Sequence, residues 1–274
     1  MKIKELAYAK INLALDVVGK RDDGYHALQM IMIPIELHDT LIFEDAKETS
    51  ITSNITIENN AILKAIHLMK ERFHMTKEVH ITLDKHIPIG AGLGGGSADI
   101  AATLRGLNRL WNLDLSLDDL AEIALELGSD TKFCIYNEPA YVHGRGEHLM
   151  FIDPIEINQI FLFPSTVEAS TKRIFQNHTV AYKRRKFQKL ITLYLNRKTH
   201  KFYKKTYNAF LKTTLKTYPE LEEKYKKIRR IFPFVQMTGS GSTFYALIFN
   251  ENIKTIEGKL DKLDIDIIKT RPKN

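Results

Sequence analysis

Apolar and polar residues alternate along much of the N-terminal part of the chain, with the period of two that is typical of β-strands. This pattern predicts strands over residues 3–18, 30–44, 50–57 and 78–83. A turn is expected after the first strand, at Lys20-Arg21-Asp22-Asp23-Gly24, because polar residues and a glycine gather there. Residues 60–73 have helical spacing instead, with one apolar face made of Ile62, Ala65, Ile66 and Met69.

Helical and strand patterns continue through the rest of the chain. Residues 97–111 predict a helix rich in small residues, which can approach its neighbours closely. A second helix is expected over 116–127, where Ser116 and Asp119 have the spacing of a capping box and Gly128 suits the C-terminal cap. Further strands are predicted over 133–136, 140–142, 148–152, 160–163, 234–237, 243–249 and 264–268. Further helices are predicted over about 184–197, 203–217, 219–231 and 251–262.

The composition of the chain shifts near residues 153–158, and no internal repeat is found. We therefore expect a mixed α+β fold in two lobes, with domains over residues 1–155 and 156–274. Apolar residues make up 44% of the 274 residues and charged residues 27%, which is a normal balance for a globular protein. No stretch approaches the roughly 18 consecutive apolar residues that a membrane span needs, and the N-terminus lacks the pattern of a signal peptide. The single cysteine, Cys134, fits a reducing compartment, so a cytoplasmic location is expected.

The net charge of +7 is concentrated in one stretch. Between Glu168 and Glu220 there are 14 Lys or Arg and no acidic residue, which leaves about −7 for the rest of the chain (7 minus 14). A basic face of this kind can attract nucleic acid, an acidic membrane surface or a phosphorylated ligand. A solvated lysine-rich surface explains the same residues, and both interpretations stay open.

A glycine-rich loop follows the strand predicted over 78–83, with the sequence PIGAGLGGGSADIAA from Pro88. Five glycines occur in the seven residues Gly90 to Gly96, so the backbone N–H groups lie free of any Cβ. Ser97 then opens a helix whose first N–H groups and dipole point into the loop. The loop is therefore predicted to bind phosphate, although a tight turn packed under a helix is the plainer alternative.

Two common phosphate loops do not fit this sequence. A Walker A loop needs Lys-Ser/Thr after its last glycine, whereas Ala98 and Asp99 follow Ser97 here. A dinucleotide fingerprint is matched in spacing by three glycines and an acid: Gly90, Gly92, Gly95 and Asp114. That fingerprint requires its acid at the end of a second parallel strand. Asp114 lies between two predicted helices, so the required βαβ unit is missing.

The loop resembles instead the phosphate loop of the GHMP kinases, P-x-x-x-G-L-G-[SG]-[SG]-S-A. Two further motifs agree in order: Ala9-Lys10-Ile11-Asn12-Leu13 near the N-terminus and Met237-Thr238-Gly239-Ser240-Gly241-Ser242-Thr243 near the C-terminus. The resemblance implies an N-terminal lobe like ribosomal protein S5 domain 2, a ferredoxin-like C-terminal lobe, and the use of ATP and Mg²⁺. The residues that it implies for ATP are Pro88, Gly90, Ala91, Gly92, Leu93, Gly94, Gly95, Gly96, Ser97, Ala98 and, more weakly, Asn60. It also implies a third-motif turn (Gly239, Ser240 and Gly241) that packs beside the loop.

Within this family the sequence is most similar to the kinases of the non-mevalonate isoprenoid pathway. Asp23-Gly24-Tyr25-His26 carries this similarity, and Gly128-Ser129-Asp130 and Gly144-Arg145-Gly146-Glu147 extend it. The acceptor implied is the 2-hydroxyl of the methylerythritol moiety of a cytidine diphosphate conjugate. The resemblance implies no nucleic acid and no membrane partner, and it leaves monomer and homodimer open.

The resemblance assigns roles to individual residues. Asp130 is the base that takes the proton of the acceptor hydroxyl. Lys10 lies on an otherwise apolar strand, which is an unusual place for an unpaired ammonium, so it is expected to pair with Asp130 and hold it ionised. Asn12 lies on the same strand face and is expected to bind substrate. A cap at Asp130 and a snorkelling edge lysine at Lys10 are the structural alternatives.

Other residues are assigned to the substrate and to the metal. Tyr25 is expected to stack on cytosine and His26 to hydrogen-bond its edge. Thr171 and Phe175 resemble a family segment whose phenylalanine closes the other side of the base, although Lys172 replaces its proline. Ser97 is the hydroxyl expected on phosphate or Mg²⁺.

The sequence departs from the family at two places. Thr131-Lys132-Phe133 stands where the family has Val/Ile-Pro-Phe, so Lys132 could bind phosphate or compete for the Asp130 carboxylate. The second-lobe motif is reduced to Asn208-Ala209-Phe210-Leu211, with both acids lost. Two alternatives therefore stay open: a GHMP-type kinase with another small-molecule acceptor, and a non-catalytic binder of nucleic acid or membrane surfaces that uses residues 169–219.

Overall fold

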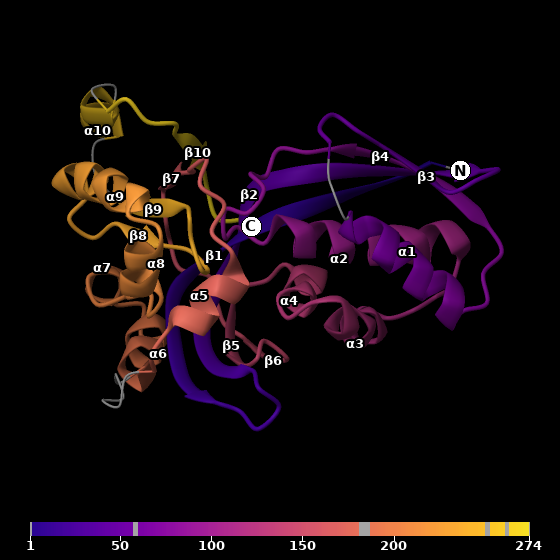
Figure 1. The fold of residues 1–274 in the computed structure, drawn as a ribbon, viewed down its shortest axis with the longest axis horizontal. Coiled ribbons are helices and arrows are strands. Elements are labelled where there is room, and N and C mark those ends of the chain that lie inside the picture. Colours follow the sequence, from indigo (N-terminus) through magenta and orange to yellow (C-terminus); the bar gives the residue numbers. More distant parts are fainter. Residues whose placement is uncertain (1, 57–59, 181–186, 250–252, 261–262, 274) are drawn as a thin grey trace. The chain divides into compact units, whose positions relative to one another are not determined.

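The chain forms two compact units whose segments interleave along the sequence. The computed structural model describes residues 2–56, 60–180, 187–249, 253–260 and 263–273 (Figure 1). Unit 1 consists of Met1–Lys10, Leu37–Pro88 and Gly94–Asn137, and unit 2 consists of Ile11–Glu36, Ile89–Leu93 and Glu138–Asn274. Both units contain helices and strands, so the predicted α+β class is confirmed.

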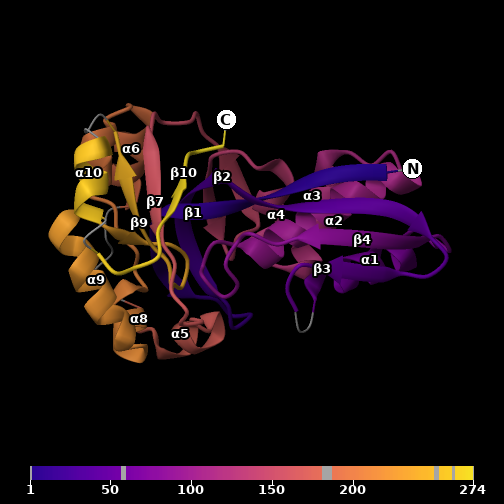
Figure 2. The ribbon, with the colours of Figure 1, turned by 90° about the horizontal axis from the view of Figure 1, so that it is seen from above.

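The described residues of unit 1 form helices and strands that belong to one sheet. Its strands are β1 (Lys2–Lys20), β2 (His26–Ala46), β3 (Ser50–Ser53) and β4 (Glu78–Asp84), of which β1 and β2 continue into unit 2. Its helices are α1 (Ala61–Arg72), α2 (Gly95–Trp111), α3 (Leu117–Leu127) and α4 (Thr131–Tyr136). β4 pairs antiparallel with β2 and parallel with β3, and all four helices lie on one side of these strands (Figures 1 and 2).

The small residues of α2 bring this helix close to the sheet, as the sequence predicts. A Cβ on Gly106 would lie 2.4 Å from a ring carbon of Phe43, a residue of β2 that is fully buried. The capping box predicted at the start of α3 is confirmed, because Ser116 and Asp119 cap each other's segment. At the start of α1, Asn60 accepts a hydrogen bond from the N–H of Ile62 and so caps that helix as well.

Unit 2 contains the remaining strands and helices. Its strands are β5 (Ala140–Gly144), β6 (His148–Phe151), β7 (Gln159–Phe163), β8 (Gln236–Met237), β9 (Phe244–Ile248) and β10 (Ile268–Thr270). Its helices are α5 (Thr171–Asn177), α6 (Phe187–Leu195), α7 (Thr199–Tyr203), α8 (Leu211–Thr217), α9 (Glu220–Ile231) and α10 (Ile253–Leu260). β5 pairs with β2 and β6, and a separate antiparallel sheet has the order β10-β7-β9-β8. Helices α8, α9 and α10 cover one side of this second sheet (Figures 1 and 2).

Two predicted elements are wrong. Residues 133–136 form part of α4 and not a strand, because their buried apolar side chains pack against α2 and α3, and this packing overrides their β-propensity. The helix predicted over 203–217 is interrupted between α7 and α8. There Leu15 of β1 donates to the carbonyl of Tyr207 and accepts from the N–H of Ala209, so backbone pairing with a strand replaces the helical hydrogen bonds.

Smaller differences concern the ends of elements. α5 forms where no helix was predicted, and Ser170 caps its N-terminus. β10 lies a few residues beyond the strand predicted over 264–268. Parts of the helices predicted over 184–197 and 251–262, and the end of the strand predicted over 50–57, lie outside the described residues. The domain boundary predicted at residue 155 stays a prediction. Within the part of the chain that the structure describes, no helix is long and apolar enough to cross a membrane.

Candidate functional site

The second half of the glycine loop forms the start of α2 in unit 1. Gly94 is the N-cap residue, with φ at 73° and no side-chain cap, and α2 begins at Gly95. The N–H groups of this first turn therefore have no capping side chain. A Cβ on Gly94 would lie 2.9 Å from Cγ of Lys10, whereas a Cβ on Gly96 would meet nothing within 4 Å. A helix start without a capping side chain, with an exposed glycine in its first turn, fits a phosphate group.

The first half of the loop packs against the third-motif turn in unit 2. Gly92 has φ at 74°, and a Cβ there would lie 2.5 Å from the carbonyl oxygen of Thr238. The Thr238 hydroxyl donates to the Gly92 carbonyl at 3.2 Å, and the N–H of Thr243 donates to the Ala91 carbonyl at 3.2 Å. The packing that the resemblance implied for this turn is therefore present within unit 2.

Two buried asparagines hold the third-motif turn in place. The amide oxygen of Asn12 accepts from the N–H of Gly239 at 3.0 Å. Asn208 donates to the carbonyls of Met237 and Gly239, both at 2.8 Å. Asn208 belongs to the reduced second-lobe motif, and in this chain it holds the third-motif turn although the neighbouring acids are absent. The substrate-binding role of Asn12 stays a prediction.

Lys10 and Asp130 form an ion pair within unit 1. Nζ of Lys10 lies 3.2 Å from Oδ2 of Asp130, and the exposed fraction of the side chain is 3% for the lysine and 31% for the aspartate. Asp130 is the N-cap residue of α4, but its side chain makes no capping hydrogen bond. The carboxylate is therefore not used as a helix cap, and it is accessible where the ammonium is not.

Lys132 does not pair with Asp130 in this structure. Its Nζ lies 2.7 Å from Oε1 of Glu122 on α3, so this cation already has a carboxylate partner. The sequence left open whether Lys132 competes for the Asp130 carboxylate, and in this structure it does not.

The single cysteine lies in the same helix, α4. Cys134 is buried, and this burial raises the pKa of its thiol to about 12.

A buried charged cluster lies behind the loop in unit 1. Nζ of Lys85 lies 2.5 Å from Asp39 and 2.7 Å from Asp99, and all three side chains are at most 6% exposed. Burial raises the pKa of Asp99 to about 7, and the charge of Lys85 opposes this rise. Oδ1 of Asp99 is buried without a hydrogen-bond partner.

The residues predicted to recognise cytosine lie together in unit 2. The rings of His26 and Phe175 are 5.1 Å apart, and Phe175 also contacts the buried Phe210 at 4.7 Å. Tyr25 is 53% exposed, and the guanidinium of Arg145 lies 5.5 Å from its ring centroid. The exposed Tyr25 ring and the tilted His26–Phe175 pair are each suited to stacking with a planar base.

Ion pairs support the turn that carries Tyr25. Arg21 binds Asp23 at 3.0 Å and Glu147 at 3.1 Å, and Asp23 accepts from the N–H of Tyr25. Glu147 also accepts from the N–H of Arg145 at 2.5 Å. The β1–β2 turn and the β5–β6 turn are thus fixed to each other. Burial, with a smaller contribution from Lys20, lowers the pKa of His26, which favours its neutral form.

The remaining predicted residues are placed as follows. The Thr171 hydroxyl lies 2.9 Å from that of Ser240, which links α5 to the third-motif turn. Asn60 caps α1, and its predicted role near the adenine of ATP stays a prediction. Ser97 is the third residue of α2, and Pro88 precedes the loop.

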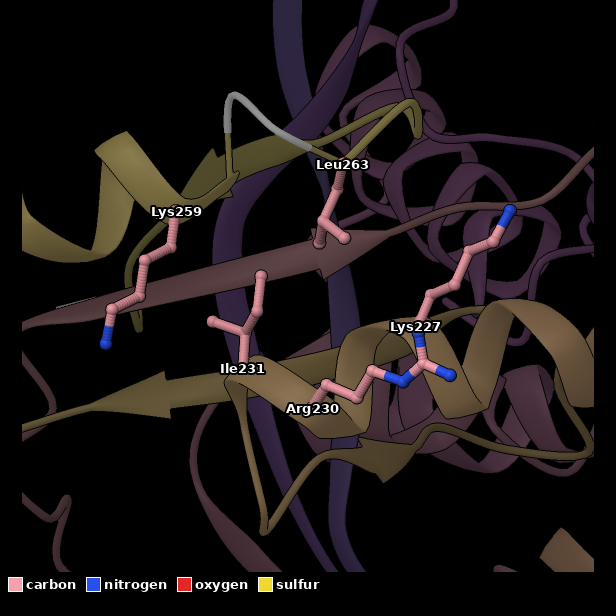
Figure 3. Close-up of a pocket in the computed structure, with 5 residues that line it drawn as sticks. All are labelled: Lys227, Arg230, Ile231, Lys259 and Leu263. Atoms are coloured by element: carbon pink, nitrogen blue, oxygen red, sulfur yellow. The ribbon is translucent and has the colours of Figure 1, made fainter.

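The structure also has a cavity of about 280 Å³ lined by Lys227, Arg230, Ile231, Lys259 and Leu263. The polar ends of the cavity's basic side chains point away from its apolar centre, and the cavity contains no predicted site residue (Figure 3).

Several residues of these sites have no role predicted from the sequence. Arg145, Phe210 and Asn208 each contact a predicted site residue or the third-motif turn. Lys85 could have been found from sequence by the argument used for Lys10, because it is a lysine beside an apolar strand. The contacts of the other three depend on tertiary structure.

Comparisons with known proteins agree with this geometry. A sequence model described as GHMP kinases N terminal domain matches residues 60–138. A 4-diphosphocytidyl-2-C-methyl-D-erythritol kinase from Bacillus velezensis is 38% identical over 260 residues, which is 92% of this chain and 90% of that protein. The kinase of the same name from Pseudothermotoga lettingae is 39% identical over 251 residues, with 89% and 90% covered.

Two solved structures have the same fold as this chain. The crystal structure of a 4-(cytidine 5'-diphospho)-2C-methyl-D-erythritol kinase has a TM-score of 0.79 and 25% identity, and the match covers 99% of this chain and 100% of that one. Mevalonate kinase of Methanococcus jannaschii has a TM-score of 0.71 at 18% identity, with 100% and 98% covered, and it shares the fold.

Proposed function

Because this chain belongs to the 4-diphosphocytidyl-2-C-methyl-D-erythritol kinase family of the GHMP kinases, we propose that it transfers a phosphoryl group from ATP to that substrate. The acceptor is the 2-hydroxyl of the methylerythritol moiety. The observation that carries this proposal is the Lys10–Asp130 pair, with Lys10 also in contact with Gly94 of the phosphate loop. A base and an anion cradle in one unit are what phosphoryl transfer to a hydroxyl requires.

The loop binds the triphosphate through its backbone. The uncapped N–H groups at the start of α2 donate to phosphate oxygens, and the helix dipole favours the negative charge. Residues Pro88 to Ala98 form this cradle, and Asn60 at the start of α1 lies beside the adenine. The third-motif turn holds the first half of the loop in its left-handed conformation through the contacts of Gly92.

Asp130 acts as the general base. Its partly exposed carboxylate accepts the proton of the acceptor hydroxyl while the bond to phosphorus forms. The buried ammonium of Lys10 orients this carboxylate and balances its charge. Positioning and charge stabilisation supply most of the rate in this chemistry, and the base contributes a smaller share.

The cytidine moiety is recognised in unit 2. Tyr25 and Phe175 stack on the base, and the neutral imidazole of His26 hydrogen-bonds its edge. Thr171 and Asn12 contact the substrate from α5 and β1. The partner that we propose is therefore a small molecule, the cytidine diphosphate conjugate, and the proposal includes neither a nucleic acid nor a membrane.

Mg²⁺ is the metal ion proposed for this reaction. Mg²⁺ usually keeps several waters and binds through substrate phosphates and one or two protein oxygens. The hydroxyl of Ser97, in the first turn of α2, is such an oxygen donor, and it lies in the same unit as Asp130. When bound, the ion neutralises charge on the phosphates. A cytoplasmic location and a monomer or homodimer complete the proposal.

An ADP-release assay with several acceptors tests this function. We expect turnover with 4-diphosphocytidyl-2-C-methyl-D-erythritol and none above background with mevalonate or homoserine. Binding of cytidine, measured by calorimetry, should be lost in Phe175→Ala while ATP binding is kept. Equal turnover with an acceptor that lacks cytidine, or no turnover with the cytidine conjugate, would reject the proposed substrate.

A further inference from the structure

The buried cluster of Lys85, Asp39 and Asp99 connects segments on both sides of the glycine loop. Lys85 directly follows β4, and the side chain of Asn54 holds its backbone through two hydrogen bonds. The N–H of Lys85 donates to Oδ1 of Asn54 at 2.8 Å, and Nδ2 of Asn54 donates to the carbonyl of Lys85 at 3.1 Å. Its side chain, 5% exposed, turns inward to the two aspartates. The lysine is therefore held at its backbone and at its ammonium.

Each aspartate fixes one segment next to the loop. Oδ1 of Asp39 accepts from the N–H groups of His86 and Ile87, at 2.6 and 2.8 Å, and these residues lead into the loop. Asp99 lies one turn into α2, the helix whose start provides the phosphate cradle. Lys85 joins the two carboxylates, so it connects the entry of the loop to the first turn of the helix.

The ammonium also contacts the loop itself. A Cβ on Gly95 would lie 3.1 Å from Nζ of Lys85 and 3.0 Å from Cγ2 of Ile87. The backbone of Gly95 therefore lies close to the lysine side chain, and a side chain at this position would require Lys85 or Ile87 to shift by a few tenths of an ångström. A displacement of Lys85 would change the position of the first N–H groups of α2.

Stability is a poor explanation for such a cluster. Desolvation of an ammonium and two carboxyl groups offsets much of the attraction among them, and buried ion pairs can often be replaced by apolar residues without loss of stability. What a buried, geometrically fixed cluster does supply is a defined arrangement of the segments that it joins. We propose that Lys85 is a positioning residue for ATP, which acts through Asp39 and Asp99 to hold the N–H groups of the phosphate cradle in place. This inference rests on the proposed use of the loop for ATP.

Calorimetric binding of ATP and of cytidine to purified variants tests the proposal. Asp99→Ala cuts the connection to α2 but leaves the Lys85–Asp39 pair intact. It is expected to fold, because Oδ1 of Asp99 has no partner and alanine suits a helix. Asp99→Asn keeps an oxygen that accepts from Lys85, and Lys85→Met removes the ammonium at similar length. Lys70→Met is the matched control, because it breaks the Lys70–Glu78 pair between α1 and β4, away from the loop.

We expect Lys85→Met to weaken ATP binding by about tenfold or more and Asp99→Ala by at least about threefold, since displaced binding groups lose affinity steeply. Asp99→Asn should restore most of the affinity, and every variant should bind cytidine within about twofold of the wild type. ATP affinity within twofold of the wild type in folded Asp99→Ala and Lys85→Met would overturn the proposal. If Lys85→Met does not fold, the ATP affinity of Asp99→Ala alone decides whether the proposal stands.

A purely structural role would lower the melting temperature of these variants and leave the ATP affinity of the folded protein unchanged. Because ATP binding is measured without an acceptor, the result is independent of the proposed substrate. A wild type that binds ATP but does not phosphorylate the cytidine conjugate would reject the proposed function and leave this inference standing.

Discussion

Replacing Gly92 by alanine places a Cβ where the backbone of the third-motif turn already lies. This Cβ would be 2.5 Å from the carbonyl oxygen of Thr238 and 2.7 Å from that of Gly241. Both neighbours are backbone atoms, so neither can rotate away as a flexible side chain would. Gly92 also has φ at 74°, in the left-handed region that side chains disfavour.

The cost of this substitution follows from these two effects. The left-handed conformation costs about 1–2 kcal/mol for a residue with a Cβ. Forced shifts of packed neighbours typically add about 1–3 kcal/mol. We therefore expect Gly92→Ala to lower the free energy of unfolding by about 2–5 kcal/mol, which corresponds to a fall in the melting temperature of at least about 4 °C.

Urea unfolding followed by circular dichroism measures this change, and ATP calorimetry on the folded fraction measures its effect on the loop. Gly19→Ala is the matched control, because a Cβ there would meet nothing within 4 Å and its backbone is not in the left-handed region. A free energy of unfolding for Gly92→Ala within about 0.5 kcal/mol of the wild type would refute the contact between the loop and the third-motif turn.

Three further predictions concern single side chains. Arg145→Ala removes the cation above Tyr25, so cytidine should bind roughly twofold to fivefold more weakly while ATP binding is unchanged; equal cytidine affinity would refute this contribution. Burial, with a smaller contribution from Lys20, lowers the pKa of His26 below its usual value, so the imidazole is mainly neutral at pH 7 and above. Cytidine affinity should therefore stay nearly constant from pH 8 to 7 and fall at lower pH as the ring protonates, whereas a flat calorimetric profile down to pH 5 would contradict this role. Burial raises the pKa of Cys134 to about 12, so this thiol should not react with a disulfide reagent at pH 8 unless the protein unfolds; rapid labelling of the folded protein would contradict its burial.

The sequence predicts best where local chemistry decides the structure. The face of α1 and the capping box at Ser116 follow from spacing alone, and both are present. The pairing of Lys10 with Asp130 follows from the cost of an unpaired ammonium on an apolar strand, combined with the family motif. In these cases the sequence alone shows what a residue needs: an apolar face needs burial, a helix start needs a capping side chain, and a buried ammonium needs a carboxylate.

Contacts between distant segments explain the errors. Residues 133–136 are rich in β-prone side chains, yet packing against two helices makes them helical. The helix predicted across Asn208 fails because that residue binds the third-motif turn and its neighbours pair with β1. Arg145 meets Tyr25 only because two turns far apart in sequence are joined through Glu147. The spacing of residues in a single sequence does not predict these contacts, because they join segments that are far apart along the chain.

The proposed kinase activity depends most directly on the carboxylate that pairs with Lys10. Single-turnover phosphoryl transfer by Asp130→Asn, compared with the wild type at saturating ATP and 4-diphosphocytidyl-2-C-methyl-D-erythritol, measures its contribution. We expect the rate of transfer to fall at least ~100-fold, the scale of a lost general base, with ATP and cytidine affinities within about twofold of the wild type. Transfer by Asp130→Asn at the wild-type rate would contradict the assignment of Asp130 as the base.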